Sequence, residues 1–369
     1  MGVPLLDLNE QHAPLMEPLR EVFERAMASG AFILGPAVEV FEKNLAAWCQ
    51  AEHAVGMSSG TDALITAMMA LGIRPGDEVI TTTFSFFATA GSIARLGAIP
   101  VFVDIDPVTF NLDVSQVEAA ITDRTAAIMP VHLFGLAADM AAISAVAQRH
   151  GLPVIEDAAQ AIGARDHDRP IGTIGTMGAL SFFPTKNLGA MGDAGAVLTN
   201  DAVLAGRLRQ IRVHGSDRTY HHLMVGGNFR IDALQAAFLD VKLPHLSRWI
   251  DARRANAARY DERLPDEGLV KPTAPAHAFH TYNQYTIRVL DGRRDALMEH
   301  LQQRGIGCRV YYPLPLHLQP CFASLGYRQG QFPVAEQMAD EVLSLPIYPE
   351  LTHEQLDEVI AAVTEFFKH

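Results

Sequence analysis

Residues 179–199 read ALSFFPTKNLGAMGDAGAVLT, and the lysine inside this stretch decides how the rest of the sequence is interpreted. An apolar strand precedes Lys186, and a glycine-rich turn that leads into another strand follows it. Burial in such apolar surroundings lowers the pKa of a lysine and makes its amine nucleophilic, as a Schiff base with an aldehyde requires. The chain contains five lysines, and we expect the other four to be solvated surface residues: Lys43, Lys242, Lys271 and Lys368.

The segments before Lys186 alternate between two kinds of pattern. Helices are expected from Pro14 to Gly30 and from Pro36 to Trp48. After them, helical patterns at 62–73 and 139–151 alternate with short runs rich in β-branched residues. These runs are 54–59, 78–83, 100–105, 126–133 and 152–157. The alternation predicts βα units on a largely parallel sheet, joined by right-handed crossovers.

The second half of the chain indicates a separate, smaller unit. A long helical region at 231–264 is followed by a proline-containing loop and then by strand-like and helical segments. These segments are 283–290 (strand), 293–305 (helix), 308–312 (strand) and 353–367 (helix). We predict a large α/β domain at residues 1–250 and a small C-terminal α+β domain at residues 251–369. The boundary is expected in the connecting helix, near residues 249–264.

Composition excludes several classes of function. Acidic residues outnumber basic ones by 42 to 29, a net charge of -13, which argues against nucleic acid as a partner. The three cysteines form no CxxC pair, so neither a disulfide scaffold nor a cysteine zinc site is expected. The start of the chain lacks a signal-peptide pattern, and no apolar run is long enough to span a bilayer. We therefore expect a cytoplasmic protein that does not act at a membrane.

A possible anion site follows the first β-branched run. The segment SSGTDAL, residues 58–64, ends a strand and begins a helix, so the amides of Gly60 and Thr61 have no partner within the helix. Free amides at a helix N-terminus attract phosphate or another anion. The same residues also suit an ordinary helix cap, and the segment alone does not separate the two interpretations.

A second polar feature ends the run at 152–157. Glu156 and Asp157 follow an apolar strand, at the carboxyl edge of the sheet where open α/β folds bind ligands. A buried acid at this edge needs a cationic partner. A helix cap or a metal ligand would explain Asp157 equally well when it is considered alone.

Together, the three features match the requirements of pyridoxal phosphate. This cofactor needs a phosphate site, a carboxylate for its pyridinium nitrogen and a lysine for its aldehyde. An ATP-binding P-loop is excluded because the chain has no G-x-x-x-x-G-K-[ST] motif. The glycines at 172, 175 and 178 have the wrong spacing for a dinucleotide fingerprint.

At the level of whole motifs, the sequence resembles the vitamin B6-dependent sugar-nucleotide aminotransferases of fold type I. The similar motifs are, in chain order, ILGPAVEVFE, SSGTDAL, PGDEVITTTFSFFATA, PVFVDIDPVTFNLD, PVHLFG, PVIEDAAQAIGA, SFFPTKNLGAMGDAGA, HGSDRTYHH, GGNFRIDALQAA and YYPLPLHLQ. They cover nearly the whole chain. The resemblance implies an α/β fold whose large domain has a mixed, mostly parallel sheet between helices, with a smaller C-terminal α+β domain.

The resemblance also implies roles for individual residues around the cofactor ring. Lys186 is similar to the lysine that forms the Schiff base and then moves the proton between the amino donor and the cofactor. Asp157 would hold the pyridinium nitrogen in its protonated form, and Gln160 would bind the ring hydroxyl. Phe86 resembles the aromatic residue that stacks on the ring, although packing in the core is an alternative role for it.

The phosphate group would be bound from two subunits. The resemblance implies contacts from the amides of Gly60 and Thr61, from Ser181, and from Asn228 of a second subunit, so it implies a homodimer with shared active sites. Relatives often have serine where this chain has Phe229. Without the resemblance, the glycines before Asn228 would indicate only a turn.

Other residues resemble positions that face the sugar and the nucleotide. These are Tyr220, Arg230 and His317, and a cationic group among them suits a diphosphate or a sugar carboxylate. A paired surface arginine and a hydrogen-bonded core histidine are the alternatives. No metal site is expected, because the histidine pairs at 221–222 and 277–280 lack nearby carboxylates or cysteines in the sequence.

The resulting hypothesis is a homodimeric transaminase in amino-sugar and polysaccharide biosynthesis. It would move an amino group from L-glutamate to the keto group of a UDP- or TDP-linked sugar, with carbon 3 favoured and a 4-keto sugar as the alternative. A sugar dehydratase of the same fold would have histidine in place of Lys186. A regulatory protein that binds pyridoxal phosphate without transamination is a further alternative, since fold alone does not prove activity.

Overall fold

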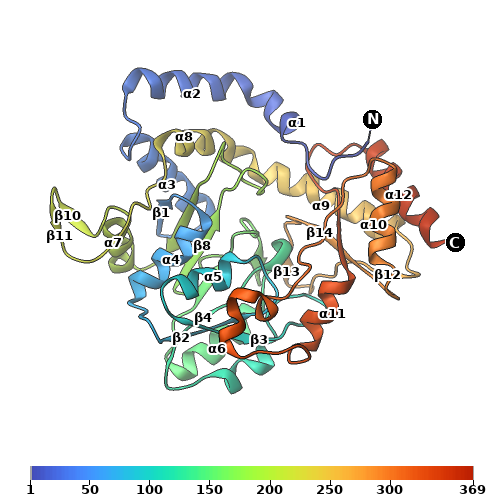
Figure 1. Ribbon diagram of the computed structural model, residues 1–369. Helices are drawn as coiled ribbons and strands as arrows, with labels where there is room; N and C mark the ends of the chain where they lie inside the picture. The colour runs from blue at the N-terminus through green and yellow to red at the C-terminus, as the bar shows by residue number, and fades with distance from the viewer. Residues whose placement is uncertain (1, 369) are drawn as a thin grey trace.

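The computed structural model describes residues 2–368, and a mixed β-sheet forms the centre of its larger part (Figure 1). Hydrogen-bonded strands follow the orders β3-β2-β4 and β5-β8-β9-β1. Backbone bridges Ile128–Val154 and Val131–Asp157 join the β4 and β5 edges into one sheet. β9 runs antiparallel to both of its neighbours, and the other pairs are parallel. The strands are β1 His53–Met57, β2 Glu78–Thr82, β3 Ile99–Val103, β4 Thr125–Met129, β5 Ile155–Asp157, β8 Met177–Ser181 and β9 Gly195–Thr199.

Helices cover both faces of this sheet because its strands are apolar on both sides. Along β8 and β9, for example, Ala179 and Val197 enter one core, whereas Leu180 and Leu198 enter the other. The first core contains residues of α4 Gly60–Leu71, α5 Ala88–Arg95 and α7 Ala202–Ile211. The second contains residues of α3 Pro36–Cys49, α6 Met140–His150 and α8 Ala233–Lys242. This arrangement is the predicted α/β fold.

The N-terminal helices lie outside these layers. α1 Leu8–His12 is followed by α2 Met16–Ser29, which packs against α8 and ends at Gly30 in a left-handed conformation (φ 64°). Figure 1 shows α2 at the outer edge of the molecule, above α8. The two helices predicted before residue 50 are therefore confirmed, with Pro36 as the first residue of α3.

A second, smaller sheet forms the C-terminal part. β12 Leu269–Val270, β14 Tyr285–Val289 and β15 Val342–Leu345 are antiparallel, in the order β12-β14-β15. Around it lie α10 Arg294–Gln303, α11 Pro333–Glu341 and α12 His353–Phe367. α12 begins with a capping box, in which the side chains of Thr352 and Gln355 bind each other's backbone amides. The remaining strands form short hairpins and pairs: β6 Arg165–Asp166, β7 Arg169–Pro170, β10 Ser216–Arg218, β11 His221–His222 and β13 Ala278–Phe279.

Helix α9 Leu246–Arg263 connects the two parts without a break. Trp249 and Ile250 belong to the core of the large sheet, whereas Ala257 and Tyr260 belong to the core of the small sheet. Val3, at the other end of the chain, also lies in the core of the small sheet, and its carbonyl accepts a hydrogen bond from the Gly307 amide. The division at residue 250 stays a prediction, and it falls within a continuous helix.

Two expectations differ from the structure. The segment 308–312 was expected as a strand, but only Arg309 makes a bridge, to Ser344 of β15. The prediction that Lys242 is a solvated surface residue is wrong, because its side chain is fully buried. Its Nζ donates to the Gly189 carbonyl at 2.5 Å and lies 3.0 Å from His12 Nε2. Burial lowers the pKa of Lys242 to about 8.

Close backbone packing at Gly178, in β8, provides a test of the fold. A Cβ atom at Gly178 would lie 2.3 Å from the Cα and carbonyl oxygen of Gly172, which itself has a positive φ of 91°. Gly178→Ala should therefore lower the free energy of unfolding by about 1–3 kcal/mol. Gly206→Ala is the matched control, because nothing lies within 4 Å of its added Cβ. Since Gly206 is in a helix, this change should stabilise the protein by up to about 1 kcal/mol. Denaturant unfolding of both variants checks the account, and equal effects would contradict it.

Candidate active site

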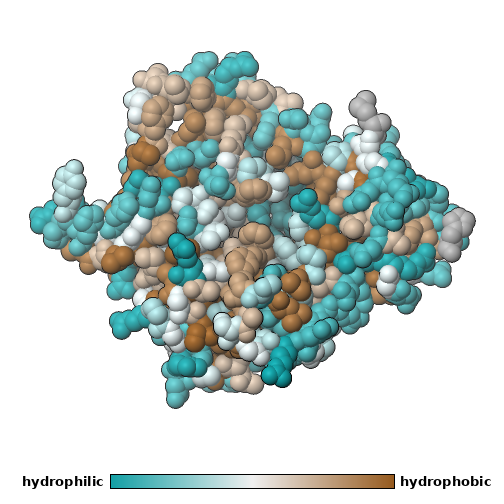
Figure 2. All heavy atoms as spheres, in the orientation of Figure 1, coloured by the Kyte–Doolittle hydropathy of each residue, from teal (hydrophilic) through white to brown (hydrophobic). Residues whose placement is uncertain are grey.

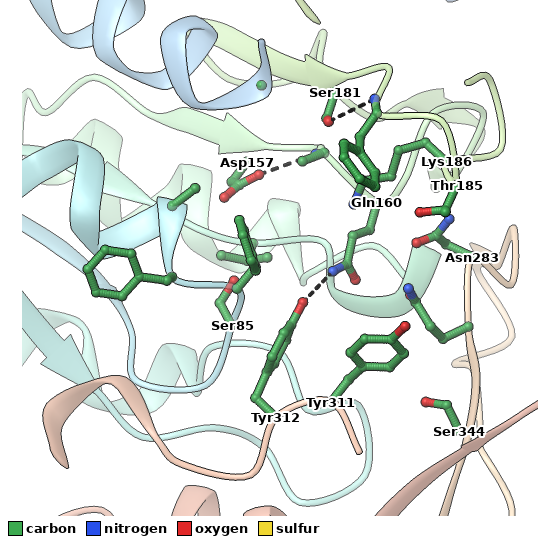
Figure 3. Close-up of a pocket in the computed structure, with 18 of the residues that line it drawn as sticks. Ser85, Asp157, Gln160, Ser181, Thr185, Lys186, Asn283, Tyr311, Tyr312 and Ser344 are labelled. Atoms are coloured by element: carbon green, nitrogen blue, oxygen red, sulfur yellow. Dashed lines mark hydrogen bonds between the residues drawn. The ribbon is translucent and has the colours of Figure 1, made fainter. Parts of the chain in front are cut away.

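A cavity of about 890 Å³ opens at the carboxyl ends of β5 and β8, between the large sheet and the C-terminal part. Its lining includes Gly60, Thr61, Asp157, Gln160 and Lys186. Ser181 and Phe86 also line it. The cavity thus gathers the residues that the sequence predicted around a cofactor ring and its phosphate, except Asn228. Figure 3 shows Asp157, Gln160, Ser181 and Lys186 around one space.

Asp157 brings a buried carboxylate to the wall of this cavity. Its side chain accepts hydrogen bonds from Thr89 Oγ1 at 2.7 Å and from the Ala159 amide at 3.2 Å. Burial raises the pKa of the Asp157 carboxyl, and the hydrogen bond from Thr89 opposes this shift. No arginine or lysine among residues 2–368 forms an ion pair with it. A bound cation, such as a protonated pyridine nitrogen, would supply the missing positive charge.

The neighbouring acid, Glu156, points elsewhere. Its oxygens accept hydrogen bonds from the amides of Gly172, Ile174 and Gly175, and one lies 3.0 Å from His132 Nε2. Because successive side chains of a strand alternate between faces, only Asp157 of the pair reaches the cavity. Glu156 holds the turn before β8 instead.

Lys186 lies on the turn between β8 and β9, as predicted. Burial lowers the pKa of its amine to about 8, and the negative charge of Asp157 acts in the opposite direction. Its Nζ forms no hydrogen bond or ion pair with any of residues 2–368. The turn is held by backbone bonds from Lys186 to Phe183 and from Ala190 to Phe182. A fixed backbone thus carries an amine that is free to react in the cavity.

The N-terminus of α4 forms the end of the cavity that the sequence predicted to hold phosphate. Ser59 Oγ caps this helix by accepting a hydrogen bond from the Asp62 amide at 3.0 Å. The amides of Gly60 and Thr61 have no acceptor among residues 2–368. A Cβ atom at Gly60 would lie 2.7 Å from the Cβ of Ser181, so only glycine leaves the space between them. Free amides beside a hydroxyl form a suitable phosphate site.

The side chains predicted to bind the cofactor ring, Gln160 and Phe86, come from two parts of the chain and both line the cavity. Gln160 Oε1 accepts a hydrogen bond from the Phe134 amide, and its Nε2 donates to Tyr312 Oη, each at 2.8 Å. Phe86 is 57% exposed, and the centroid of its ring lies 6.3 Å from that of Tyr312. Phe86 therefore lines the cavity and is not packed in the core, which suits a stacking role.

Three predicted residues lie outside the cavity of their own chain. Tyr220, at the tip of the β10–β11 hairpin, is 95% exposed, and Asn228 forms a backbone bridge to Val213. Arg230 forms a backbone bridge to Met57, and its Nε is buried without a partner among the described residues. None of the three lines the cavity. Their predicted roles need a second subunit.

His317 is also placed away from the cavity, although its neighbours Leu316 and Gln319 line it. Its buried ring lies between Thr83 Oγ1 at 2.6 Å and Glu336 Oε1 at 3.1 Å. Burial lowers the pKa of His317, and the Glu336 carboxylate opposes the shift. The position corrects the expected contact with substrate, because both ring nitrogens are occupied by protein groups. The alternative of a hydrogen-bonded core histidine fits better.

The structure brings together one group of potential metal ligands that the sequence did not reveal. Asp166 lies 2.9 Å from His167 Nδ1 and 3.4 Å from His277 Nε2, so His277 does have a carboxylate neighbour. The two imidazole rings stack with centroids 4.1 Å apart at an angle of 14°. Both histidine nitrogens lie against the same oxygen, Asp166 Oδ1, so the three side chains already use these atoms for contacts with one another. This cluster is therefore no argument for a metal.

Sequence reasoning missed several residues of the cavity. Asn283 and Tyr311 line the cavity, whereas Thr89 lies behind its wall and donates to the Asp157 carboxylate; the three come from segments far from Lys186 in the sequence. Arg253 also lines the cavity, but its guanidinium donates to the carbonyls of Tyr282, Asn283 and Ile347. Packing between elements, which local patterns do not encode, places all four.

Comparison with known proteins identifies the family. A family model described as the DegT/DnrJ/EryC1/StrS aminotransferase family matches residues 15–364. The chain belongs to this family. No helix among residues 2–368 has the length and apolarity to cross a membrane.

Curated relatives match along nearly their whole length. A "pleiotropic regulatory protein" of Geobacillus stearothermophilus is 54% identical, with all of both chains covered. A UDP-N-acetyl-3-dehydro-α-D-glucosamine 3-aminotransferase of Acidithiobacillus ferrooxidans is 46% identical, covering 98% of this chain and 97% of the relative. A dTDP-3-amino-3,4,6-trideoxy-α-D-glucose transaminase of Streptomyces venezuelae is 44% identical, covering 99% and 96%.

The fold comparison agrees with the family match. The crystal structure of DesV from S. venezuelae superposes with a TM-score of 0.97 at 44% identity, covering 100% of this chain and 99% of DesV. The predicted fold type I aminotransferase, dependent on pyridoxal 5′-phosphate, is thereby confirmed for this member of the DegT/DnrJ/EryC1/StrS family.

The lowered pKa of Lys186 can be measured in the cofactor-free protein. With five lysines in the chain, NMR of a lysine-labelled sample should show two amines that titrate near pH 8, Lys186 and Lys242. Because burial disfavours the charged form, both amines lose their proton well below the ordinary value. Lys186→Met should remove one of the two signals and Lys242→Met the other. A Lys186 amine that titrates near 10.5 would contradict the burial argument.

Proposed function

We propose that this aminotransferase moves an amino group from L-glutamate to carbon 3 of a UDP- or TDP-linked keto sugar, in the biosynthesis of amino sugars for polysaccharides. The observation that carries the proposal is that Lys186 and Asp157 line one cavity with the free amides of α4. The names of the 46% and 44% identical relatives support a nucleotide-linked sugar and carbon 3 over carbon 4.

Each residue of the cavity has a chemical task in this proposal. When bound, pyridoxal phosphate supplies an aldehyde that captures amines and a ring that accepts an electron pair. Gly60, Thr61 and Ser181 would hold its phosphate, and Asp157 would keep the ring nitrogen protonated. Lys186 would take the proton from the donor's α carbon and return a proton during amination of the sugar. A pKa of about 8 leaves part of the amine neutral at physiological pH and so able to accept that proton.

Amino-donor binding also needs a site for carboxylates. Two arginines line the cavity, Arg253 and Arg309. Arg253 is committed to backbone carbonyls, whereas the guanidinium of Arg309 makes no hydrogen bond or ion pair with residues 2–368. Arg309 is therefore the residue of this wall that suits a carboxylate of L-glutamate.

The proposed homodimer explains two features of the single chain. Exposed apolar side chains gather on α2 and the segment after it, including Met16, Phe23, Met27, Phe32 and Ile33. Figure 2 shows this apolar surface over α2. Burying such a patch against a second copy is favourable. The same contact would let Asn228, Arg230 and Tyr220 reach a partner's cavity. The three unpaired cysteines suit the proposed cytoplasmic location.

A regulatory role without transamination is the second candidate, because the 54% identical relative is named as a regulatory protein. Mere binding of the cofactor needs neither a proton-transferring lysine nor a buried carboxylate at the ring nitrogen. The two roles therefore make different predictions for Lys186 and Asp157.

Lys186→Ala should abolish the reaction with L-glutamate, and Asp157→Asn should lower its rate at least 100-fold. The first change removes the base, and the second removes the charge that keeps the ring nitrogen protonated. Single-turnover kinetics that follow the absorption of the bound cofactor and the formation of 2-oxoglutarate measure both effects. Glu156→Gln is unsuitable as a control because Glu156 holds the turn before β8, so Glu299→Gln, an exposed surface change, serves instead. Normal rates in both active-site variants would overturn the proposed function.

The proposed shared active site predicts complementation between two impaired variants. Lys186→Ala inactivates the site of its own chain, and Asn228→Ala should weaken the phosphate site of the partner. A mixed dimer of the two variants regains one complete site, with Lys186 from one protomer and Asn228 from the other. Activity should therefore appear on mixing and subunit exchange, up to about one quarter of the wild-type value for random pairing. Mixtures no more active than the sum of the separate variants would exclude the predicted role of Asn228 across the interface.

A further inference from the structure

Asn283 has a polar atom that the reaction described above does not use. The residue lies just before β14, is 6% exposed and lines the cavity. Its Oδ1 is buried without a hydrogen-bond partner among residues 2–368. Figure 3 shows the Asn283 carboxamide beside Thr185 and Lys186. A buried polar atom without a partner costs about 1–3 kcal/mol, so its retention at a ligand cavity needs an explanation.

A chain of hydrogen bonds fixes which atom of the carboxamide is free. Asn187 Nδ2 donates to the Thr281 carbonyl at 3.2 Å, and Asn283 Nδ2 donates to Asn187 Oδ1 at 3.1 Å. The Thr281 carbonyl can only accept, so Asn187 must point its amino group there and its oxygen toward Asn283. Asn283 in turn must use its amino group for Asn187. The free atom is therefore the oxygen, which can only accept a hydrogen bond.

The chemistry of the two substrates decides which of them can bind this oxygen. The carboxylates of L-glutamate are acceptors, and its amine is the group being transferred. A sugar ring carries hydroxyl groups, which are hydrogen-bond donors. We propose that Asn283 Oδ1 accepts a hydrogen bond from a hydroxyl group of the nucleotide-linked keto sugar and so contributes to sugar recognition. This inference rests on the proposed function.

Gln284, the next residue, does not carry the same argument. Its Oε1 is also buried without a partner, but no hydrogen bond fixes the orientation of its carboxamide. Rotation of that group by half a turn would exchange oxygen and nitrogen. At Asn283, by contrast, the hydrogen bonds through Asn187 determine that the free atom is the oxygen.

The two half-reactions provide the test, because they use different substrates in the same cavity. Asn283→Ala should weaken binding of the keto sugar about 3- to 10-fold, the effect of one hydrogen bond. The rate with L-glutamate and the absorption band of the bound cofactor should stay unchanged. Gln303→Ala, which removes an exposed carboxamide from α10, is the matched control and should change neither half-reaction. Equal losses in both half-reactions would show that Asn283 acts through Asn187 and the lysine turn, and unchanged sugar binding would also overturn the proposal.

Deoxygenated sugars test the same contact from the ligand side. A keto sugar that lacks the contacted hydroxyl should bind the wild type 3- to 10-fold more weakly, but should bind Asn283→Ala as well as the full sugar does. If the affinity lost by removing a hydroxyl and the affinity lost in Asn283→Ala were additive for every hydroxyl tested, the proposed contact would be contradicted. Calorimetry with the nucleotide-linked amino-sugar product measures binding without turnover. A wild type that binds this product but fails to react with L-glutamate would refute the proposed donor and leave the Asn283 contact testable.

Discussion

Asp157 places a carboxylate in the interior of the protein, and the arrangement of the site depends on how that charge is accommodated. The side chain receives hydrogen bonds from Thr89 and from the Ala159 amide, and its backbone bridges to Val131 at the junction of the two strand groups. No lysine or arginine of the described chain pairs with it. A cationic ring nitrogen would complete this environment, and the proposed site would then join the sheet junction, the buried charge and the cofactor.

Lys186 and the start of α4 are placed around that charge by the same sheet. β5 and β8 are parallel neighbours, so Asp157 and the turn after Ser181 lie at the same edge of the sheet. Gly60 packs closely against Ser181, which brings the free amides of α4 to the same cavity. Elements of the C-terminal part close the cavity through Tyr311, Tyr312 and Asn283. The strands thus position the groups proposed to hold the cofactor's ring and phosphate, and the C-terminal part supplies the wall proposed to bind the sugar.

Features of the site that depend on local sequence could be predicted, whereas those that depend on contacts between distant segments could not. Gly60, Asp157 and Lys186 each follow a strand that the sequence reveals, and the carboxyl ends of neighbouring strands must meet. Thr89, Asn283 and the burial of Lys242 depend on contacts between segments far apart in the sequence, which no local pattern encodes. The pattern around His317 could not show that Thr83 and Glu336 occupy both ring nitrogens. For Asn228, Arg230 and Tyr220, the roles that the sequence predicted depend on the proposed second subunit.

The most direct test of the account is the transfer of nitrogen by the wild-type protein. The cofactor-loaded enzyme is treated with ¹⁵N-labelled L-glutamate, freed of excess donor, and then given UDP- or TDP-linked 3-keto and 4-keto sugars in separate reactions. The account predicts one equivalent of 2-oxoglutarate per active site, followed by ¹⁵N in a 3-amino sugar. A protein that binds the cofactor but releases no 2-oxoglutarate, or that aminates only 4-keto sugars, would contradict it.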